Sequence, residues 1–141
     1  MNSMIEAPRI FPTFRYKDAA AMIEWLEKAF GFKTFAKHMD GETVAHAELA
    51  LGASMIMIGS VRDDKYGAMV EGPGVSGGKS TYVVTEDVDA LFERAEAAGA
   101  DMLTGLTDQD YGSRDFICRD PEGNVWCFGT YWPKVHEMTE K

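Results

Sequence analysis

A histidine and a glutamate stand two residues apart in the segment VAHAEL, residues 44–49, and they are the first candidates for chemistry. Successive side chains on a strand point to opposite faces, so His46 and Glu48 share one face while the apolar residues beside them share the other. An imidazole beside a carboxylate suits either metal ligation or general acid–base catalysis. The alternative is a solvated, hydrogen-bonded polar pair at the rim of a cleft. The pair is a candidate catalytic site, and whether the protein is an enzyme stays open.

Arg114 and the two cysteines are the other residues whose types could support chemistry. Arg114, in the segment YGSRDF with Tyr111, could pair with a carboxylate or phosphate on a ligand, or with the neighbouring Asp110 or Asp115 at the surface. A cysteine becomes a nucleophile when a base or a positive charge lowers its pKa, and no such neighbour can be named for Cys127. We therefore expect both thiols to be free, reduced and inert.

Composition narrows the class of partner. The chain has 141 residues, 14 Lys and Arg, 23 Asp and Glu, and a net charge of −9. Such an acidic balance argues against nucleic acid or an anionic membrane as the main partner. No apolar run approaches the roughly 20 residues of a membrane span, and the N-terminal residues lack the apolar region of a secretion signal. We expect a soluble protein of the cytoplasm.

The chain contains an internal repeat. Residues 13–35 align without a gap to residues 81–103 at an offset of 68 positions, since 81 − 13 = 68. Both segments read as a strand, an acidic helix start, an amphipathic helix and a glycine stop. A repeat of this kind predicts two modules with the same local structure.

Each repeat carries signals for one helix. Asp18 and Asp87 are placed to cap the helix starts, and Gly31 and Gly99 supply the left-handed residue that commonly ends a helix. The apolar stripes predicted to face a sheet are Met22, Ile23, Leu26 and Phe30 in the first helix and Val88, Leu91, Phe92 and Ala95 in the second.

Strand signals follow each helix. In the first half, turns at Asp40-Gly41 and Gly52-Ala53 divide residues 32–59 into three strands. In the second half, the predicted strands DMLTGL, RDFICR and NVWCFGTY surround a turn at residues 120–123. Each half therefore reads as βαβββ.

The modules define the expected domain organisation. We predict a single domain, residues 1–141, with modules at about 9–60 and 79–132. Residues 61–78 form a glycine-rich connection that is either a functional loop or a plain linker. Residues 133–141 are a polar tail.

Two βαβββ halves that end in DPEGNVWCFGTY, residues 120–131, resemble the vicinal oxygen chelate superfamily. This superfamily includes glyoxalase I, bleomycin-resistance proteins and extradiol dioxygenases. The resemblance extends over residues 9–132, and its most specific part is Asp120–Trp126. It implies an α+β fold in which two tandem βαβββ modules form curved mixed sheets around a cleft, with the helices on the convex side. It also implies that paired modules form the cleft, often across a homodimer.

The resemblance also assigns positions to the metal ligands of the superfamily enzymes. These positions hold Phe11, Glu48, Ser80 and Cys127 here, and only Glu48 is an ordinary ligand. We therefore expect no required cofactor. The alternative is a divalent zinc, nickel, iron or manganese ion held by Glu48 with His46 or Cys127.

Strand alternation predicts which other residues face the cleft. Trp126 and Phe128 should point into the core, and an apolar dimer face is the alternative to a cleft. The predicted ligand-binding residues are Phe11, Thr13, Arg15, Met55, Met57, Ser80, Tyr82, Tyr111, Arg114, Val125 and Cys127.

The sequence thus predicts a glyoxalase/bleomycin-resistance-like protein that binds a small, partly apolar molecule, as a homodimer and without the usual metal. The first alternative is a metal-dependent lyase, isomerase or dioxygenase that uses Glu48 with His46 or Cys127. The second is a metal-free enzyme with His46 as its base.

Overall fold

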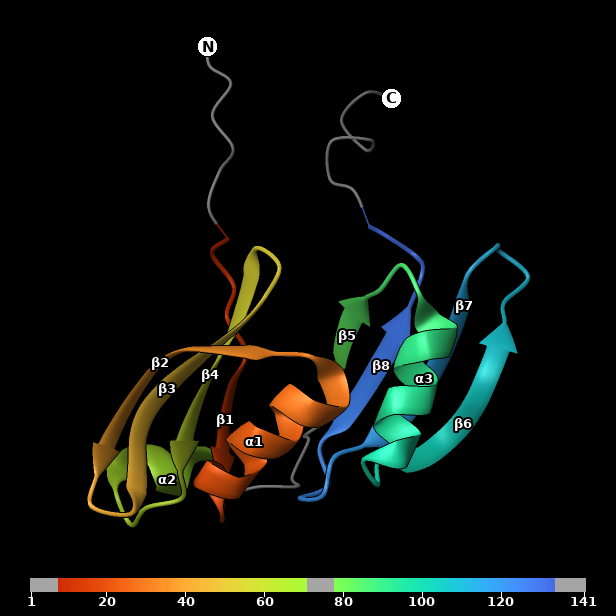
Figure 1. The fold of residues 1–141 in the computed structure, drawn as a ribbon. Coiled ribbons are helices and arrows are strands. Elements are labelled where there is room, and N and C mark those ends of the chain that lie inside the picture. The colour runs from red at the N-terminus through yellow and green to blue at the C-terminus, as the bar shows by residue number, and fades with distance from the viewer. Residues whose placement is uncertain (1–7, 71–77, 134–141) are drawn as a thin grey trace. The chain divides into compact units, whose positions relative to one another are not determined.

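The structure, a computed structural model, describes residues 8–70 and 78–133 (Figure 1). The chain divides into two compact units, residues 1–75 and 76–141, and the predicted modules fall one in each unit. Residues 71–77 of the predicted connection and 134–141 of the predicted tail lie outside the described residues.

The first unit is a four-stranded mixed sheet with strand order β1-β4-β3-β2. β1 and β4 are parallel, and the other neighbours are antiparallel. The elements are β1 (Thr13–Tyr16), α1 (Ala19–Phe30), β2 (Lys33–Asp40), β3 (Thr43–Leu51), β4 (Ser54–Ser60) and α2 (Lys65–Val70).

The second unit repeats this plan, with strand order β5-β8-β7-β6 and a parallel pair formed by β5 and β8. Its elements are β5 (Thr81–Val84), α3 (Val88–Ala97), β6 (Asp101–Asp108), β7 (Arg114–Arg119) and β8 (Val125–Gly129). Eight strands in two mixed sheets confirm the predicted α+β class with two tandem βαβββ modules.

One long helix covers one face of each sheet, α1 in the first unit and α3 in the second (Figure 1). The predicted stripe of α1 is buried, and so are the alternate residues Ala47, Leu49, Ile56 and Ile58 of the strands beneath it. In the second unit Phe116, Trp126 and Phe128 are fully buried, as predicted for the latter two. Burial of such side chains stabilises a fold by roughly 1.5–3 kcal/mol each.

The repeat is less regular than the gapless alignment predicts. Asp18 and Asp87 accept hydrogen bonds from the third residue after each, as predicted for caps, but they stand 69 residues apart (87 − 18) rather than 68. Gly31 and Gly99, which are 68 apart, both have positive φ angles, of 86° and 92°. The helix starts therefore correspond at an offset of 69, whereas β1 and β5, and likewise β2 and β6, begin 68 residues apart as predicted.

A second helix, α2, occupies part of the predicted connection. The Oδ1 atom of Asp64 accepts a hydrogen bond of 2.7 Å from the backbone N–H of Gly67, and its carbonyl accepts one from Ala68. These bonds satisfy donors that a helix start leaves without partners. The sequence did not predict this helix, because the high glycine content of residues 61–78 indicates a loop.

The hairpin between β7 and β8 depends on the buried carboxylate of Asp120. Its Oδ1 accepts backbone hydrogen bonds from Glu122 and Asn124, each 3.0 Å long. Its Oδ2 accepts a 3.0 Å bond from the indole N–H of Trp126, whose ring is fully buried. The motif DPEGNVW thus closes a turn and anchors a core tryptophan.

Among the helices of the described segments, none is long and apolar enough to cross a membrane.

Candidate functional site

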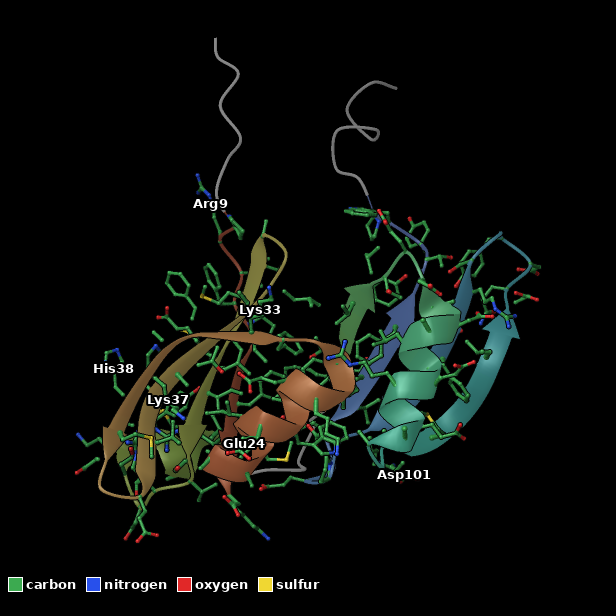
Figure 2. All side chains as sticks on the ribbon, in the orientation of Figure 1. Arg9, Glu24, Lys33, Lys37, His38 and Asp101 are labelled. Carbon is green, nitrogen blue, oxygen red and sulfur yellow. The ribbon has the colours of Figure 1, made fainter. Side chains whose placement is uncertain are left out.

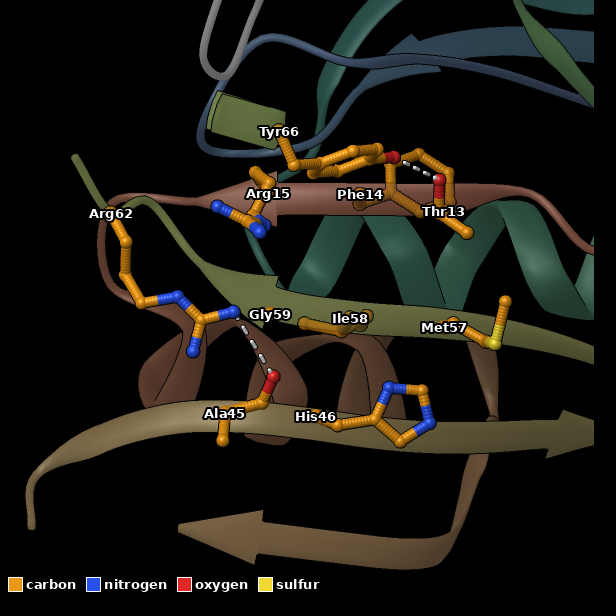
Figure 3. Close-up of a pocket in the computed structure, with 10 residues that line it drawn as sticks. All are labelled: Thr13, Phe14, Arg15, Ala45, His46, Met57, Ile58, Gly59, Arg62 and Tyr66. Carbon is orange, nitrogen blue, oxygen red and sulfur yellow. Dashed lines mark hydrogen bonds between the residues drawn. The ribbon is translucent and has the colours of Figure 1, made fainter. Parts of the chain in front are cut away.

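A pocket of about 210 Å³ opens on the first unit, on the sheet face opposite α1 (Figure 3). Thr13 and Arg15 reach it from β1, because Phe14 and Tyr16 between and after them turn toward the core. The lining residues are Thr13, Phe14, Arg15, Ala45, His46, Met57, Ile58, Gly59, Arg62 and Tyr66.

Arg15 is the best-held polar group of this pocket. Its two terminal nitrogens donate hydrogen bonds to the two carboxylate oxygens of Asp64, each 3.3 Å long. The ring of Tyr66 lies over the guanidinium, with 4.8 Å between the ring centroid and Cζ. The Tyr66 hydroxyl and the Thr13 hydroxyl are 3.0 Å apart and hydrogen-bonded (Figure 3). Aromatic stacking and a two-point ion pair thus fix the orientation of Arg15.

The Arg15 contact perturbs the titration of Asp64. The hydrogen bonds from Arg15, and next the bond from the Gly67 N–H, hold the pKa of the Asp64 carboxyl below its usual range.

Arg62 lies at the other side of the pocket and is less completely satisfied. Its terminal nitrogen donates a 3.4 Å hydrogen bond to the carbonyl of Ala45 (Figure 3). Its Nε is buried and, within the described part of the chain, makes no hydrogen bond; Oδ2 of Asp64 is 3.7 Å away. A buried N–H without an acceptor is costly, so this atom is a ready donor for a ligand.

His46 and Glu48 form the pair that strand alternation predicts. Nε2 of His46 is 3.0 Å from Oε2 of Glu48, and both side chains are partly exposed. His38, labelled on the edge strand β2 in Figure 2, is the direct cross-strand neighbour of His46. The centroids of the two rings are 6.4 Å apart. The arrangement can bind a polar group or move a proton at the open side of the pocket.

Four of the predicted ligand-binding or catalytic residues come together in this pocket: Thr13, Arg15, His46 and Met57. Glu48 does not line the pocket, but its carboxylate is hydrogen-bonded to His46, which does. Glu48 lies opposite Met57 across the β3–β4 pair. Phe11 precedes β1, and Met55 lies on β4 two residues from Met57; neither lines the pocket.

The predicted residues of the second unit gather on their own sheet face. Tyr82 lies opposite Cys127, and its hydroxyl donates a 2.7 Å hydrogen bond to the Tyr131 carbonyl. The Tyr131 ring also contacts Tyr111 edge-on, 6.1 Å between centroids. Val125 lies on β8 two residues before Cys127, and Ser80 directly precedes β5.

Burial dominates the electrostatics of this second face. It raises the pKa of the Cys127 thiol, and the nearby Asp115 carboxylate raises it further. Burial likewise raises the pKa of the Tyr82 hydroxyl. A thiol with a raised pKa is a poor nucleophile and a poor metal ligand, which agrees with the expectation that Cys127 is inert.

Arg114 is held by carboxylates on the helix-covered side of its sheet. Its Nε donates a 2.7 Å hydrogen bond to Asp89 on α3, and a terminal nitrogen donates a 3.0 Å bond to Asp108. These partners differ from the two aspartates that the sequence suggested. Arg114 therefore ties α3 to the strands β6 and β7 and, within the described unit, faces away from Tyr82 and Cys127.

Sequence reasoning missed Arg62, Tyr66 and Asp64. All three lie in the predicted connection, which was treated as a loop without assigned contacts. Asp64, which directly precedes KYGAMV, is the helix-start signal that would have placed Tyr66 on a helix.

The residues at the four superfamily ligand positions do not form an ordinary site for the divalent metal that superfamily enzymes hold. Phe11 and Ser80 occupy two of these positions, and burial raises the pKa of the Cys127 thiol at a third. His46 and Glu48 are hydrogen-bonded to each other. Within residues 8–70 and 78–133, no three His, Cys, Asp or Glu side chains are grouped so that they could hold a metal.

Curated relatives share this sequence over most of its length. An uncharacterized protein of Mycobacterium bovis is 32% identical over 126 residues, which cover 86% of this chain and 82% of the relative. An uncharacterized protein of Mycobacterium tuberculosis is also 32% identical over 126 residues, with 86% and 74% covered.

Solved structures share the fold. TioX from Micromonospora sp. ML1 is 28% identical with a TM-score of 0.70, over 89% of this chain and all, 100%, of that one. A glyoxalase/bleomycin resistance protein/dioxygenase family enzyme from Burkholderia phytofirmans PsJN is 24% identical with a TM-score of 0.65, over 84% and 94%. The sequence model of one family matches residues 10–128, which include both βαβββ modules and the DPEGNVW turn. The chain therefore belongs to the Glyoxalase/Bleomycin resistance protein/Dioxygenase superfamily.

Proposed function

We propose that the protein binds a small, partly apolar molecule in the pocket of the first unit, without the usual superfamily metal. The observation that carries this proposal is the pocket itself, about 210 Å³ lined by the side chains of Met57 and Tyr66 with a few convergent polar groups. Apolar walls with a small number of placed polar side chains are typical of ligand sites. A cavity of about 150 Å³ suffices for benzene, so a ring-sized molecule fits.

The test uses benzyl alcohol as a neutral probe and the methionine methyl groups as reporters. In the full chain labelled with ¹³C-methyl methionine, benzyl alcohol should shift the Met57 signal while Met102 on β6 stays unchanged. Gly59→Leu should abolish the shift, because a Cβ at Gly59 points at ordinary contact distance toward Arg15, 3.6 Å from its Nε, and a longer side chain fills the pocket.

The matched control is Gly105→Leu, because an added Cβ at Gly105 of β6 meets no atom within 4 Å. This variant should keep the Met57 shift. A Met57 shift that persists in Gly59→Leu, or the absence of any shift at millimolar benzyl alcohol, would overturn binding in this pocket.

The proposed independence from metal has its own measurement. The donor set supports it, since Glu48 is the one ordinary ligand among the four superfamily positions. After incubation with zinc, nickel, iron or manganese and removal of excess ion, plasma mass spectrometry should find far less than one ion per chain. One ion per chain in the native protein, lost in Glu48→Gln, would instead favour a metal-dependent lyase, isomerase or dioxygenase.

A second candidate is metal-free proton transfer by the His46–Glu48 pair. The 3.0 Å contact between them and the position of His46 in the pocket wall favour it. The first substrate to test is the adduct of glutathione and methylglyoxal. Turnover that survives a chelator and is lost in His46→Ala would support this candidate, and turnover that survives His46→Ala would exclude it.

We also propose that the protein works as a homodimer in the cytoplasm. The modules of this superfamily often pair across two chains, and two free cysteines in an acidic chain suit a reducing compartment. Light scattering after size exclusion should give twice the chain mass of 15.6 kDa. A mass of one chain at micromolar concentration would contradict the dimer.

A further inference from the structure

The residues that line the pocket of the first unit differ in charge type from the chain as a whole. The protein carries 23 acidic and 14 basic residues. Yet the ten described residues that line the pocket include two arginines, Arg15 and Arg62, and no aspartate or glutamate. A concave, partly desolvated site with this lining attracts anions.

The Asp64 carboxylate already occupies the position that Arg15 and Arg62 offer to an anion, here called the anion seat. Its carboxylate accepts both Arg15 hydrogen bonds side by side, at 3.3 Å each, and its Oδ2 lies 3.7 Å from the Arg62 Nε. This is the two-point geometry in which arginine recognises a planar carboxylate, although the bonds are longer than the usual 2.7–2.9 Å or so of charge-assisted pairs. The two arginines thus form a position for an anion, and the Asp64 carboxylate binds there through long contacts.

The segment that carries Asp64 is weakly held. α2 has six residues and no buried side chain, and Met69 is mostly exposed. Its described links to β1 are the Arg15–Asp64 pair and the contacts of Tyr66 with Thr13 and Arg15. Little buried apolar area opposes a displacement of Asp64 from the arginines.

Arg62 gives the second, independent sign of a missing acceptor. Its Nε is the one buried side-chain nitrogen or oxygen without a hydrogen-bond partner in the described part of the chain. A ligand oxygen placed between Arg15 and Arg62 would satisfy this donor, which Asp64 reaches only at 3.7 Å.

We propose that the ligand of this pocket carries a carboxylate on an apolar, ring-sized body, and that its carboxylate replaces Asp64 on Arg15 and Arg62. Met57 and Tyr66 would contact the ring. The inference rests on the proposed binding function and adds the chemical class of the ligand. It assigns Arg62 and Asp64 to recognition, the first as a donor and the second as a competitor.

The test compares benzoate with benzyl alcohol on the full chain, by NMR titration of Met57. Benzoate should bind about tenfold more tightly, because it makes charge-assisted hydrogen bonds that the alcohol cannot make. Arg15→Gln should lower the affinity for benzoate far more than the affinity for benzyl alcohol, so that the preference is lost. Arg119→Gln is the control for loss of an arginine elsewhere, since Arg119 forms a longer, more exposed pair with Asp101 in the second unit.

Asp64→Asn tests the competition directly. Removing the internal carboxylate should strengthen benzoate binding by up to about fivefold, the scale of one exposed ion pair. It should change the affinity for benzyl alcohol less than the affinity for benzoate, and Asp101→Asn should change neither. Unchanged or weaker benzoate binding in Asp64→Asn would overturn the replacement of Asp64.

The outcomes separate this inference from the function on which it rests. Benzyl alcohol and benzoate bound equally well would leave the pocket a binding site and overturn its preference for carboxylates. Neither probe bound would overturn the binding function itself. Phenyl phosphate bound more tightly than benzoate, with the same dependence on Arg15, would assign the seat to phosphate and overturn the carboxylate.

Discussion

Equivalent strand positions carry different side chains in the two units. In the first, Thr13 lies opposite Met57 across a parallel pair; in the second, Tyr82 lies opposite Cys127 in the corresponding pair. Thr13 and Tyr82 each stand five residues before their helix cap, which establishes the correspondence. A small hydroxyl leaves the first face open for a pocket, whereas a tyrosine covers the second.

The next positions along these strands sharpen the contrast. Arg15 lies opposite Gly59, and Val84 lies opposite Gly129. A Cβ built on Gly129 would stand 2.8 Å from the Tyr82 hydroxyl, whereas the nearest atom to one on Gly59 is the Ala45 carbonyl oxygen at 3.5 Å. The corresponding sheet faces thus differ: the face of the first unit is open and carries charged side chains, whereas that of the second unit is filled and largely uncharged.

The acid–base pair is also confined to the first unit. Glu48 lies opposite Met57 as Ile117 lies opposite Cys127, so the partner of the histidine is replaced by an apolar residue. Two residues before Ile117 stands Asp115, a carboxylate only 8% exposed, which accepts a 3.1 Å hydrogen bond from the Gln109 amide. Duplication of the backbone plan did not duplicate the chemistry.

The largest expected effect comes from Asp120→Ala, because the two units close their last hairpins differently. Both hairpins contain a glycine with a positive φ, Gly52 at 60° and Gly123 at 96°, and the second hairpin adds the three hydrogen bonds accepted by the buried Asp120. Loss of these acceptors leaves buried donors unsatisfied and should cost about 3 kcal/mol of unfolding free energy. Urea unfolding followed by circular dichroism measures it.

The control for this change is Asp101→Ala, which removes an exposed pair with Arg119 at 3.7 Å and should cost less than about 0.5 kcal/mol. Equal costs for the two variants would show that Asp120 does not anchor the hairpin.

The equivalent glycines Gly59 and Gly129 test the difference between the open face of the first unit and the filled face of the second. Gly129→Ala should lower the unfolding free energy by about 1–2 kcal/mol, because its Cβ would crowd Tyr82 and, at 3.0 Å, the Cβ of Asp115. Gly59→Ala should stay within about 0.5 kcal/mol of the native protein. Addition of Tyr82→Phe should recover part of the Gly129→Ala loss. Similar costs at both glycines would break the contrast between the faces.

The elements that the sequence predicted well are those with strong local signals. Asp18 and Asp87 cap helices, and the Asp40-Gly41 and Gly52-Ala53 turns join strands as predicted. Local capping and turn chemistry determine these features, so one sequence suffices. The offset of the repeat was wrong by one residue at the helix starts, because α1 and α3 differ in length while their end glycines keep the same spacing.

The residues of the candidate site that the sequence predicted are those on strands, where alternation shows which side chains share a face. Thr13, Arg15, His46 and Met57 share a face because they sit on paired strands. Tyr66 and Arg62 belong to the segment after β4. No hydrophobic periodicity in the sequence predicts how this segment crosses the sheet. The partners of Arg114 were missed for a related reason, since Asp89 approaches it from a helix 25 residues away in the sequence.

Cysteine reactivity offers a smaller, chemical test of the second face. Because burial and then Asp115 raise the pKa of Cys127, less of it is thiolate at neutral pH than in an ordinary cysteine. Iodoacetamide should therefore modify it more slowly than it modifies glutathione at pH 7, and the rate should keep rising above pH 9. Asp115→Asn should speed the reaction, as mass spectrometry can measure.

Cys118 is the internal control, since burial raises its pKa to about 12 and should leave it unmodified in the folded protein. Modification of Cys127 faster than glutathione at pH 7 would indicate a lowered pKa and would return it to the candidate nucleophiles.

The smallest expected effect is the titration of Asp64, which reports on the open face of the first unit. Its folded pKa lies below the ordinary value of about 3.9, so its contribution to stability is present above that value and is lost as the pH falls through the folded pKa. In Arg15→Gln, the pKa measured by carboxyl ¹³C NMR should rise but stay lowered, because the Gly67 N–H still donates to the carboxylate. Asp89, whose pKa Arg114 lowers in the second unit, should not respond. If Asp64 titrates identically with and without Arg15, the pair does not form in solution, and the anion seat has no internal competitor.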